Sequence, residues 1–327
     1  IAYALRKAEG GPARLLPLGC LTQRGEGQQM AELHDMRLAG AVGFTDDLHP
    51  IANSRLLAIA LEYSAHLPGG APPIMVFAQD AHLIAQGVMH EGRVSAQLGL
   101  RSIPAEAEAI RAARDIALLE YAGGHLHLAC ISTAQAVELV RQAKARKLKV
   151  SASVAAHHLL LDDSALAGFD SNFKVMPPLR DQAHIDALRQ GLKDGTIDAI
   201  VSDHRPEDRE SKAIELGRAA FGIAGIETAF AAAHTALRGT ASLRRIIERL
   251  AHGPRQVLGL PPQHLHEGAS ADISLFDPEA DWVPREDDLV SLARNTPFIG
   301  HRFRGRAVGC VAQGRLTLAP AYAAACG

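Results

Sequence analysis

Polar side chains that can bind a metal or transfer a proton stand at the ends of several short apolar runs. They are Asp46-Asp47 in GFTDD, Gln79-Asp80 in VFAQD, His125, His127 and Cys130 in HLHLAC, His157-His158 in SVAAHH, and Asp203-His204 in VSDH. Imidazole, thiolate and carboxylate groups are the donors that hold a catalytic zinc ion, and the ion activates a bound water for hydrolysis. These residue types indicate a hydrolytic metal site if the fold brings them together.

Each group also has an ordinary structural explanation. A paired aspartate after a strand is often a helix N-cap. His125 and His127 lie on one face of a strand by its period of two, where a hydrogen-bonded pair is commoner than a metal site. His157 and His158 would point to opposite faces of a strand, so at most one of them reaches a shared site. Asp203, beside an imidazole at the tip of an apolar strand, is the strongest candidate, because such a group is costly to bury without a partner.

The elements that must position these residues alternate along the chain. Six apolar runs predict strands at 13–19, 40–45, 73–78, 125–131, 148–154 and 198–203, and helical patterns predict helices at 53–67, 105–123 and 133–147. Continuous apolar strands that alternate with helices are typical of a parallel sheet buried on both faces. No GxGxxG follows any of these strands, which disfavours a dinucleotide-binding fold.

We therefore predict an α/β fold of the (β/α)₈ TIM-barrel type, in which chemistry lies at the carboxyl ends of the strands. Such a barrel has eight strands, so we expect the first two to lie outside this chain. The pattern changes after about residue 260, where glycine-rich spacing predicts tight turns and short strands. We predict a barrel over residues 1–265 and a small β-sandwich appendage over residues 266–327.

Composition narrows the class of protein. Hydrophobic residues make up 47% of the 327 residues, charged residues 21%, and the net charge is -2. A large core is therefore expected, whereas nucleic-acid and membrane partners are not. Four scattered cysteines (Cys20, Cys130, Cys310 and Cys326) without a CxxC pair favour a reducing compartment, and we expect a cytoplasmic protein.

The sequence resembles the dihydroorotase branch of the amidohydrolase superfamily over almost its whole length. The matching motifs include GFTDD, HLHLACISTAQAVELV, KVMPPLR, VSDHRPED, HGPRQVLGL and NTPFIGHRFRG. The resemblance implies a (β/α)₈ barrel with a small β-sandwich. It also implies bound zinc that activates a water to open a cyclic amide, which in pyrimidine biosynthesis is dihydroorotate.

Several positions depart from the family's pattern. Phe77 stands where the fifth strand carries a zinc-binding histidine, and Cys130 stands at the zinc-binding histidine of the sixth. Met176 replaces an asparagine that touches substrate, and Glu207 replaces the last histidine of the Asp-His-Ala-Pro-His motif, in which Arg205 replaces the alanine. The family's first His-x-His pair belongs to a first strand absent from this chain, and His125-x-His127 is not its replacement.

The remaining donors are few. Asp203 persists as a vestigial base, and Asp46, Asp47, Cys130 and Asp203 are the possible residual metal ligands. Phenylalanine has no donor atom, and without zinc a water keeps a pKa far above neutrality. The first hypothesis is a non-catalytic homologue that needs no cofactor, forms a homodimer and associates with aspartate carbamoyltransferase. The alternative is a zinc-dependent dihydroorotase, or a relative acting on hydantoin or allantoin.

Overall fold

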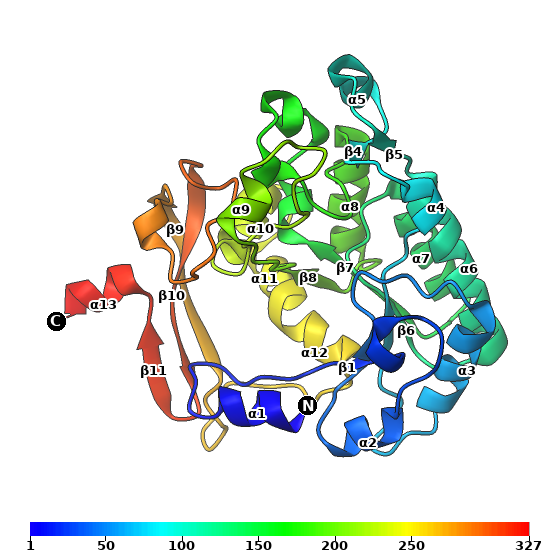
Figure 1. Cartoon of the computed structure of the whole chain (residues 1–327). Coiled ribbons are helices and arrows are strands. Elements are labelled where there is room, and N and C mark those ends of the chain that lie inside the picture. The colour runs from blue at the N-terminus through cyan, green and yellow to red at the C-terminus, as the bar shows by residue number, and fades with distance from the viewer. Residues whose placement is uncertain (327) are drawn as a thin grey trace.

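The centre of the molecule is a sheet of six parallel strands. The computed structural model describes residues 1–326, and its main sheet has the order β1-β2-β3-β6-β7-β8 (Figure 1). The strands are β1 (Gly19–Cys20), β2 (Phe44–Thr45), β3 (Ile74–Val76), β6 (Leu126–Leu128), β7 (Val150–Ala155) and β8 (Ala199–Val201). Each predicted run overlaps one of these strands, the first at Gly19 alone, and the predicted α/β fold with a parallel sheet is confirmed.

Burial on both faces explains the continuous apolar runs. Every residue of β6 and β7 is buried, and the register pairs Ile74 with Leu126 and Leu126 with Val150. On β8, Ile200 pairs with Val154 in the same core. A strand buried on both sides needs no solvated face, and the polar residues of β6 and β7, His127, Ser151 and Ser153, bond to one another within the core.

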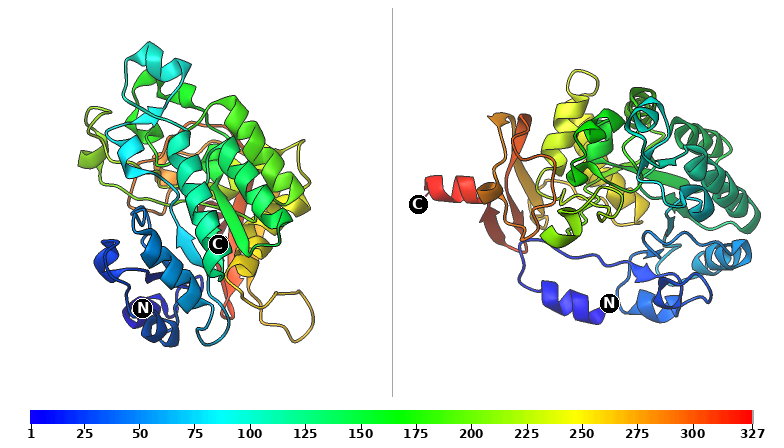
Figure 2. Two further views of the ribbon diagram at one scale, coloured as in Figure 1. Left: turned by 90° about the vertical axis from the view of Figure 1, so that its right-hand side faces the viewer. Right: turned by 45° about the horizontal axis from the view of Figure 1, so that its top comes forward.

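Helices cover the outer side of the sheet. Helices α3, α6, α7 and α8 lie side by side around it (Figure 1 and Figure 2). The helices of the chain are α1 (Ala2–Ala8), α2 (Leu33–Leu38), α3 (Ser54–Ser64), α4 (Ala81–Ile84), α5 (Arg93–Leu98), α6 (Glu106–Ala122), α7 (Ala134–Ala145), α8 (Gln182–Asp194), α9 (Arg209–Lys212), α10 (Ala229–Leu237), α11 (Leu243–Ile247), α12 (Gly253–Val257) and α13 (Pro320–Cys326). Short 3₁₀ segments are η1 (Gln23–Gly25), η2 (Ala156–Leu159), η3 (Asp163–Gly168), η4 (Ser171–Phe173) and η6 (Glu286–Asp288), and η5 (Glu248–His252) is a π-helix. The three predicted helices correspond to α3, α6 and α7.

Two parts of the barrel differ from the predicted elements. The first strand begins at Gly19 rather than at residue 13, because Pro17 has no backbone N–H to donate to a ladder. The segment 81–104, for which no element was predicted, holds α4, α5 and a two-stranded parallel sheet of β4 (Met89–His90) and β5 (Ser102–Ile103). The sequences around β4 and β5, QGVMHEGR and LRSIPA, form no apolar run that would mark a strand.

The C-terminal region forms a small β appendage of one sheet, whereas the prediction was a β-sandwich of two. Its strands β9 (Ile273–Trp282), β10 (Phe303–Ala312) and β11 (Arg315–Leu318) make one antiparallel sheet. The N-terminal segment reaches this sheet before it returns to β1 (Figure 1), and the Arg315 guanidinium donates to the Gly10 carbonyl at 2.7 Å. The predicted boundary at residues 265 and 266 lies in a segment without helix or strand, residues 260–272.

Cys20, Cys130 and Cys310 are free thiols, and the side chain of Cys326 lies outside the described part of the chain. None of the helices in residues 1–326 has both the length and the apolar character needed to span a bilayer.

Candidate functional site

Three predicted site residues share an unusual backbone conformation at the carboxyl ends of the sheet. Asp47 follows β2, Cys130 follows β6 and Asp203 follows β8, with φ angles of 53°, 51° and 43°. A non-glycine residue in this left-handed region costs on the order of 1–3 kcal/mol, and such strain gathers at functional sites. The backbone at these strand ends is therefore that of an active-site scaffold.

Arg205 occupies the space between the two aspartates. Its Nη1 and Nη2 donate to Oδ2 and Oδ1 of Asp47, and its Nε donates to Oδ1 of Asp203, all at 3.0 Å. The Asp203 side chain is 7% exposed and that of Arg205 21%, whereas that of Asp47 is 66% exposed. The two-pronged contact with Asp47 is the strong, directional geometry of an arginine–carboxylate pair.

Asp47, Arg205 and Asp203 form a triad in which the charged groups change one another's pKa. The hydrogen bond from Arg205 holds the pKa of Asp47 below its usual range. Burial raises the pKa of Asp203 although Arg205 opposes the change. Burial disfavours the charge of Arg205, but the hydrogen bond from Asp47 and the charges of Asp203 and Asp47 outweigh it and raise the pKa of Arg205. Asp203 therefore keeps the capacity to accept a proton, but its Oδ1 is already hydrogen-bonded to Arg205.

Asp46 is separate from this triad. Its carboxylate accepts hydrogen bonds from the Thr22 backbone N–H at 2.9 Å and the Thr22 hydroxyl at 2.5 Å, and so it ties the ends of β1 and β2 together. The helix-cap explanation for the aspartate pair is wrong, because Asn53 caps α3. Of the two aspartates, Asp47 is the one whose carboxylate contacts Arg205.

Three positions were predicted to have lost a metal-binding or substrate-binding residue, namely Phe77, Cys130 and Met176. Their side chains are apolar or, for Cys130, a protonated thiol. Phe77 and Met176 are buried in one apolar cluster with Ile103 and Ala107. Burial, and then the charge of Asp203, raises the pKa of the Cys130 thiol well above its ordinary value. Zinc binds the thiolate, so this environment disfavours the form of Cys130 that would be a ligand.

His157 and His158 do not alternate across a strand as predicted. Strand β7 ends at Ala155, and both histidines lie in the 3₁₀ segment η2 with ring centroids 4.5 Å apart. Burial lowers the pKa of each to about 3, and the charge of Arg205 also lowers that of His157. His158 donates through Nε2 to the Pro177 carbonyl at 3.0 Å. Both rings are therefore neutral core groups.

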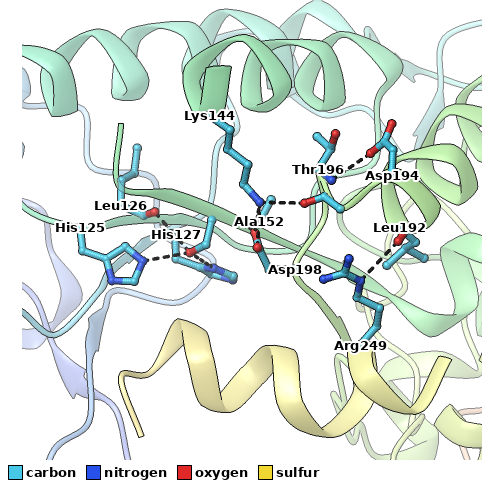
Figure 3. Close-up of polar contacts among 12 residues, drawn as sticks. His125, Leu126, His127, Lys144, Ala152, Leu192, Asp194, Thr196, Asp198 and Arg249 are labelled. Carbon is cyan, nitrogen blue, oxygen red and sulfur yellow. Dashed lines mark hydrogen bonds and ion pairs between the residues drawn. The ribbon is translucent and has the colours of Figure 1, made fainter. Parts of the chain in front are cut away.

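His125 and His127 bind serines of the neighbouring strand. The two ring nitrogens of His127 contact the hydroxyls of Ser151 and Ser153 at 2.9 and 3.0 Å, and His125 Nε2 lies 3.2 Å from the Ser151 hydroxyl. Figure 3 shows the rings of His125 and His127 beside one another. Burial lowers the pKa of His127 to about 3. Both nitrogens of His127 are engaged, so neither is available to a metal ion.

The other polar residues at strand ends shape the surrounding loops. Asp80 caps α4 by accepting from the backbone N–H groups of His82 and Leu83. Gln79 donates to the buried carboxylate of Glu108 at 3.1 Å. The Ile226 N–H donates to His204 Nδ1 at 3.4 Å. His204 therefore contacts the backbone rather than the triad.

Glu207, predicted as a degenerate substrate position, borders a cavity of about 800 Å³. The cationic residues Arg209, Lys212 and Arg294 line it together with the acidic residues Asp170, Asp208 and Glu286. The Lys212 ammonium is not free for a ligand, because it donates to the carbonyls of Lys174, Ala220 and Gly222. The mixed charge of the lining gives no strong preference for an anionic substrate.

A second cluster that sequence reasoning missed consists of His90, Asp181 and His184, whose ligand atoms lie within 4.8 Å of one another. Arg180 donates to Nδ1 of His90 at 3.1 Å, and the Ala134 N–H donates to Nδ1 of His184 at 3.0 Å. Each ring therefore carries its proton on Nε2 when neutral, so no Nε2 lone pair remains for a metal. The cluster binds internal groups rather than an ion.

These observations test the fit of a zinc ion. Within residues 1–326, the cluster at His90 is the one group of three or more such side chains with ligand atoms close enough to share an ion, and it does not include Asp46, Asp47, Cys130 or Asp203. Of the donors at the strand ends, Asp47 and Asp203 are paired with Arg205 and Asp46 is paired with Thr22. The residues present do not fit a catalytic zinc ion.

Comparison with known proteins places the chain in a family. The model of the family "Dihydro-orotase-like" matches residues 4–136. A dihydroorotase of Anaeromyxobacter dehalogenans is 42% identical over 314 residues, which cover 95% of this chain and 72% of that protein. A dihydroorotase of Pelobacter propionicus is 39% identical over 312 residues, with 95% and 73% covered.

The chain belongs to the dihydroorotase-like branch of the amidohydrolase superfamily. Solved structures agree with the fold of this family. The L-hydantoinase of Arthrobacter aurescens superposes with a TM-score of 0.82 over 97% of this chain and 73% of that chain, at 23% identity. A D-hydantoinase from Thermus sp. gives 0.76 over 97% and 72%, at 20% identity. At these identities the likeness shows the barrel fold, as predicted from the sequence.

Two buried acidic residues of α6 were not predicted although the sequence carried a signal for them. Glu108 and Asp115 lie on the same helical stripe as the buried Ala112, Ile116 and Leu119 of α6. Acidic residues at core positions of an amphipathic helix indicate buried polar networks. Thr22 gave no such signal, because its partner Asp46 is 24 residues away.

Proposed function

We propose that this member of the dihydroorotase-like family is not a hydrolase but a structural or assembly subunit of aspartate carbamoyltransferase in pyrimidine biosynthesis. The observation that carries the proposal is the arginine bridge: Arg205 pairs with both Asp47 and Asp203. The guanidinium engages the group that would serve as base. Phe77 supplies no donor atom, and Met176 lies in the same apolar cluster.

The partner follows from the resemblance to non-catalytic dihydroorotase homologues that associate with this transferase. Under the proposal the inherited barrel serves as a scaffold, which explains why the core and the strained strand ends persist without a working ligand set. We also propose that the protein forms a homodimer and resides in the cytoplasm, where the free thiols of Cys20 and Cys310 stay reduced.

The experiment has a catalytic part and an assembly part. Purified protein is assayed for dihydroorotate hydrolysis and for the reverse cyclisation, with and without added zinc, and we expect no turnover. Asp203→Asn is the matched control, because turnover from this site would be lost in the variant, whereas turnover from a contaminating enzyme would persist. Turnover that requires both zinc and Asp203 would overturn the proposal.

For assembly, the protein is mixed and also co-expressed with aspartate carbamoyltransferase of the same organism. Size-exclusion chromatography with light scattering should show a complex heavier than either component. Two separate peaks under both conditions would refute the proposed partner, while the absence of turnover would still stand.

A second candidate is an active dihydroorotase, or a related enzyme acting on hydantoin or allantoin. It is favoured by the relatives named dihydroorotase at about 40% identity and by the strained backbone kept at the three strand ends. This candidate requires metal ligands beyond those present at the strand ends. It predicts zinc-dependent turnover in the assay above.

A further inference from the structure

Arg205 is held in place from its backbone as well as from its side chain. The Arg205 N–H donates to the Ile223 carbonyl at 2.9 Å, and the Arg205 carbonyl accepts from Asn295 Nδ2 at 2.8 Å. A Cβ at Gly222 would approach the Cβ of Arg205 to 2.8 Å and its carbonyl to 2.9 Å, and Gly222 has a φ of +148°. The surrounding loops are therefore built closely against Arg205 and fix the direction of its side chain.

The side chain joins two strands that are distant in sequence. Asp47 follows β2 and lies 158 residues from Arg205, whereas Asp203 follows β8. Two carboxylates near one another repel and need a cation between them, above all where one of them is buried. A single guanidinium supplies that charge and fills three hydrogen bonds at 3.0 Å.

We infer that Arg205 is a built-in counter-cation that stands where a divalent metal ion would bind between Asp47 and Asp203, and that it excludes such an ion from the strand ends. The inference rests on the proposed non-catalytic function and gives a physical reason why the site would hold no metal ion. Carboxylate oxygens are good ligands for Mg²⁺, Mn²⁺ and Zn²⁺. Removing the guanidinium should therefore convert the pair of aspartates into a metal-binding site.

The test compares the wild type with Arg205→Ala and, as a second neutral variant, Arg205→Gln. Each is stripped with chelator, and its melting temperature is measured with and without ZnCl₂, MnCl₂ or MgCl₂. Bound metal is measured by equilibrium dialysis and elemental analysis. Arg209→Ala is the matched control, because its guanidinium is 75% exposed and lies 3.8 Å from Glu286, away from the triad.

We expect no metal-dependent change in the wild type or in Arg209→Ala. The Arg205 variants should melt lower in chelator and bind one ion per chain. A metal at 100-fold its dissociation constant should raise their melting temperature by about 5 °C. Adding Asp203→Asn to Arg205→Gln should abolish this response.

The outcomes separate the two claims. If neither folded Arg205 variant binds metal while the wild type is metal-free and inactive, the inference is wrong and the proposed function stands. If the wild type itself binds zinc and turns over dihydroorotate, the proposed function fails as well.

Discussion

Glu108 anchors the loop that carries Cys130, and its replacement by glutamine should destabilise the protein strongly. The side chain is almost completely buried, and its carboxylate accepts from the N–H and hydroxyl of Ser132 at 2.9 and 2.5 Å. It also accepts from the N–H and hydroxyl of Thr133, both at 2.8 Å, and from Gln79 Nε2 at 3.1 Å. Five donors thus converge on one acceptor-only group between α6 and α7.

Glutamine has nearly the same shape but presents an NH₂ group in place of one oxygen. The hydroxyl of Ser132 and the amide of Gln79 can turn to accept from this group, but all five hydrogen bonds lose their charged acceptor. A hydrogen bond to a charged acceptor contributes about 1 kcal/mol more than one to a neutral acceptor, so Glu108→Gln should lower the free energy of unfolding by about 3–5 kcal/mol. Glu106→Gln is the control, because Glu106 is exposed in the same helical turn and its loss should cost no more than about 1 kcal/mol.

The assay is urea unfolding followed by far-UV circular dichroism, with both variants measured against the wild type. A Glu108→Gln midpoint indistinguishable from that of Glu106→Gln would refute the reasoning. It would mean that the loop after β6 does not depend on this carboxylate.

Three further predictions follow from the same structure. Phe77→His combined with Cys130→His should give no dihydroorotate turnover, because Arg205 still holds both aspartates; measurable turnover would show that the bridge is no obstacle. Three buried histidines have a pKa lowered to about 3, namely His127, His157 and His158. Their neutral rings stabilise the fold fully above the unfolded pKa of about 6.5, and this contribution is lost as the pH falls towards 3, with a slope of up to about 4 kcal/mol per pH unit; urea midpoints that stay constant from pH 8 to 5.5 would contradict it. Gly253→Ala should cost about 3 kcal/mol or more, because its Cβ would meet the Asp198 carbonyl; thermal melts should show Gly217→Ala, which meets no atom within 4 Å, unchanged.

The strands and main helices could be predicted because burial leaves a direct mark on sequence. Strand β7 is buried throughout and consists of valine, alanine and two small serines, and α7 shows its buried stripe at Ala136, Val137, Val140 and Ala143. The end of β7 was predicted to within one residue, but the assignment of His157 and His158 to opposite faces of a strand was wrong, because the chain has already turned into η2. Apolar character marks burial, not the point at which a strand ends.

The residue types of the candidate site could be predicted from the sequence, but the contacts between them could not. Phe77 and Met176 could be identified as positions without metal or substrate donors, and they share an apolar cluster. The partner of Arg205 could not be identified, because no local pattern links it to Asp47 across 158 residues. The different contacts of the two neighbouring aspartates could not be predicted either. Asp46 accepts a hydrogen bond from Thr22, whereas Asp47 accepts from Arg205.

The most direct test of the account is the zinc content per chain of the intact protein, purified without chelator and measured by elemental analysis after size-exclusion chromatography. The arginine bridge between Asp47 and Asp203 predicts far less than one zinc per chain, unchanged when zinc is supplied during expression. One zinc or more per chain that survives the column would contradict the account, and would show that the strand ends hold a working metal centre.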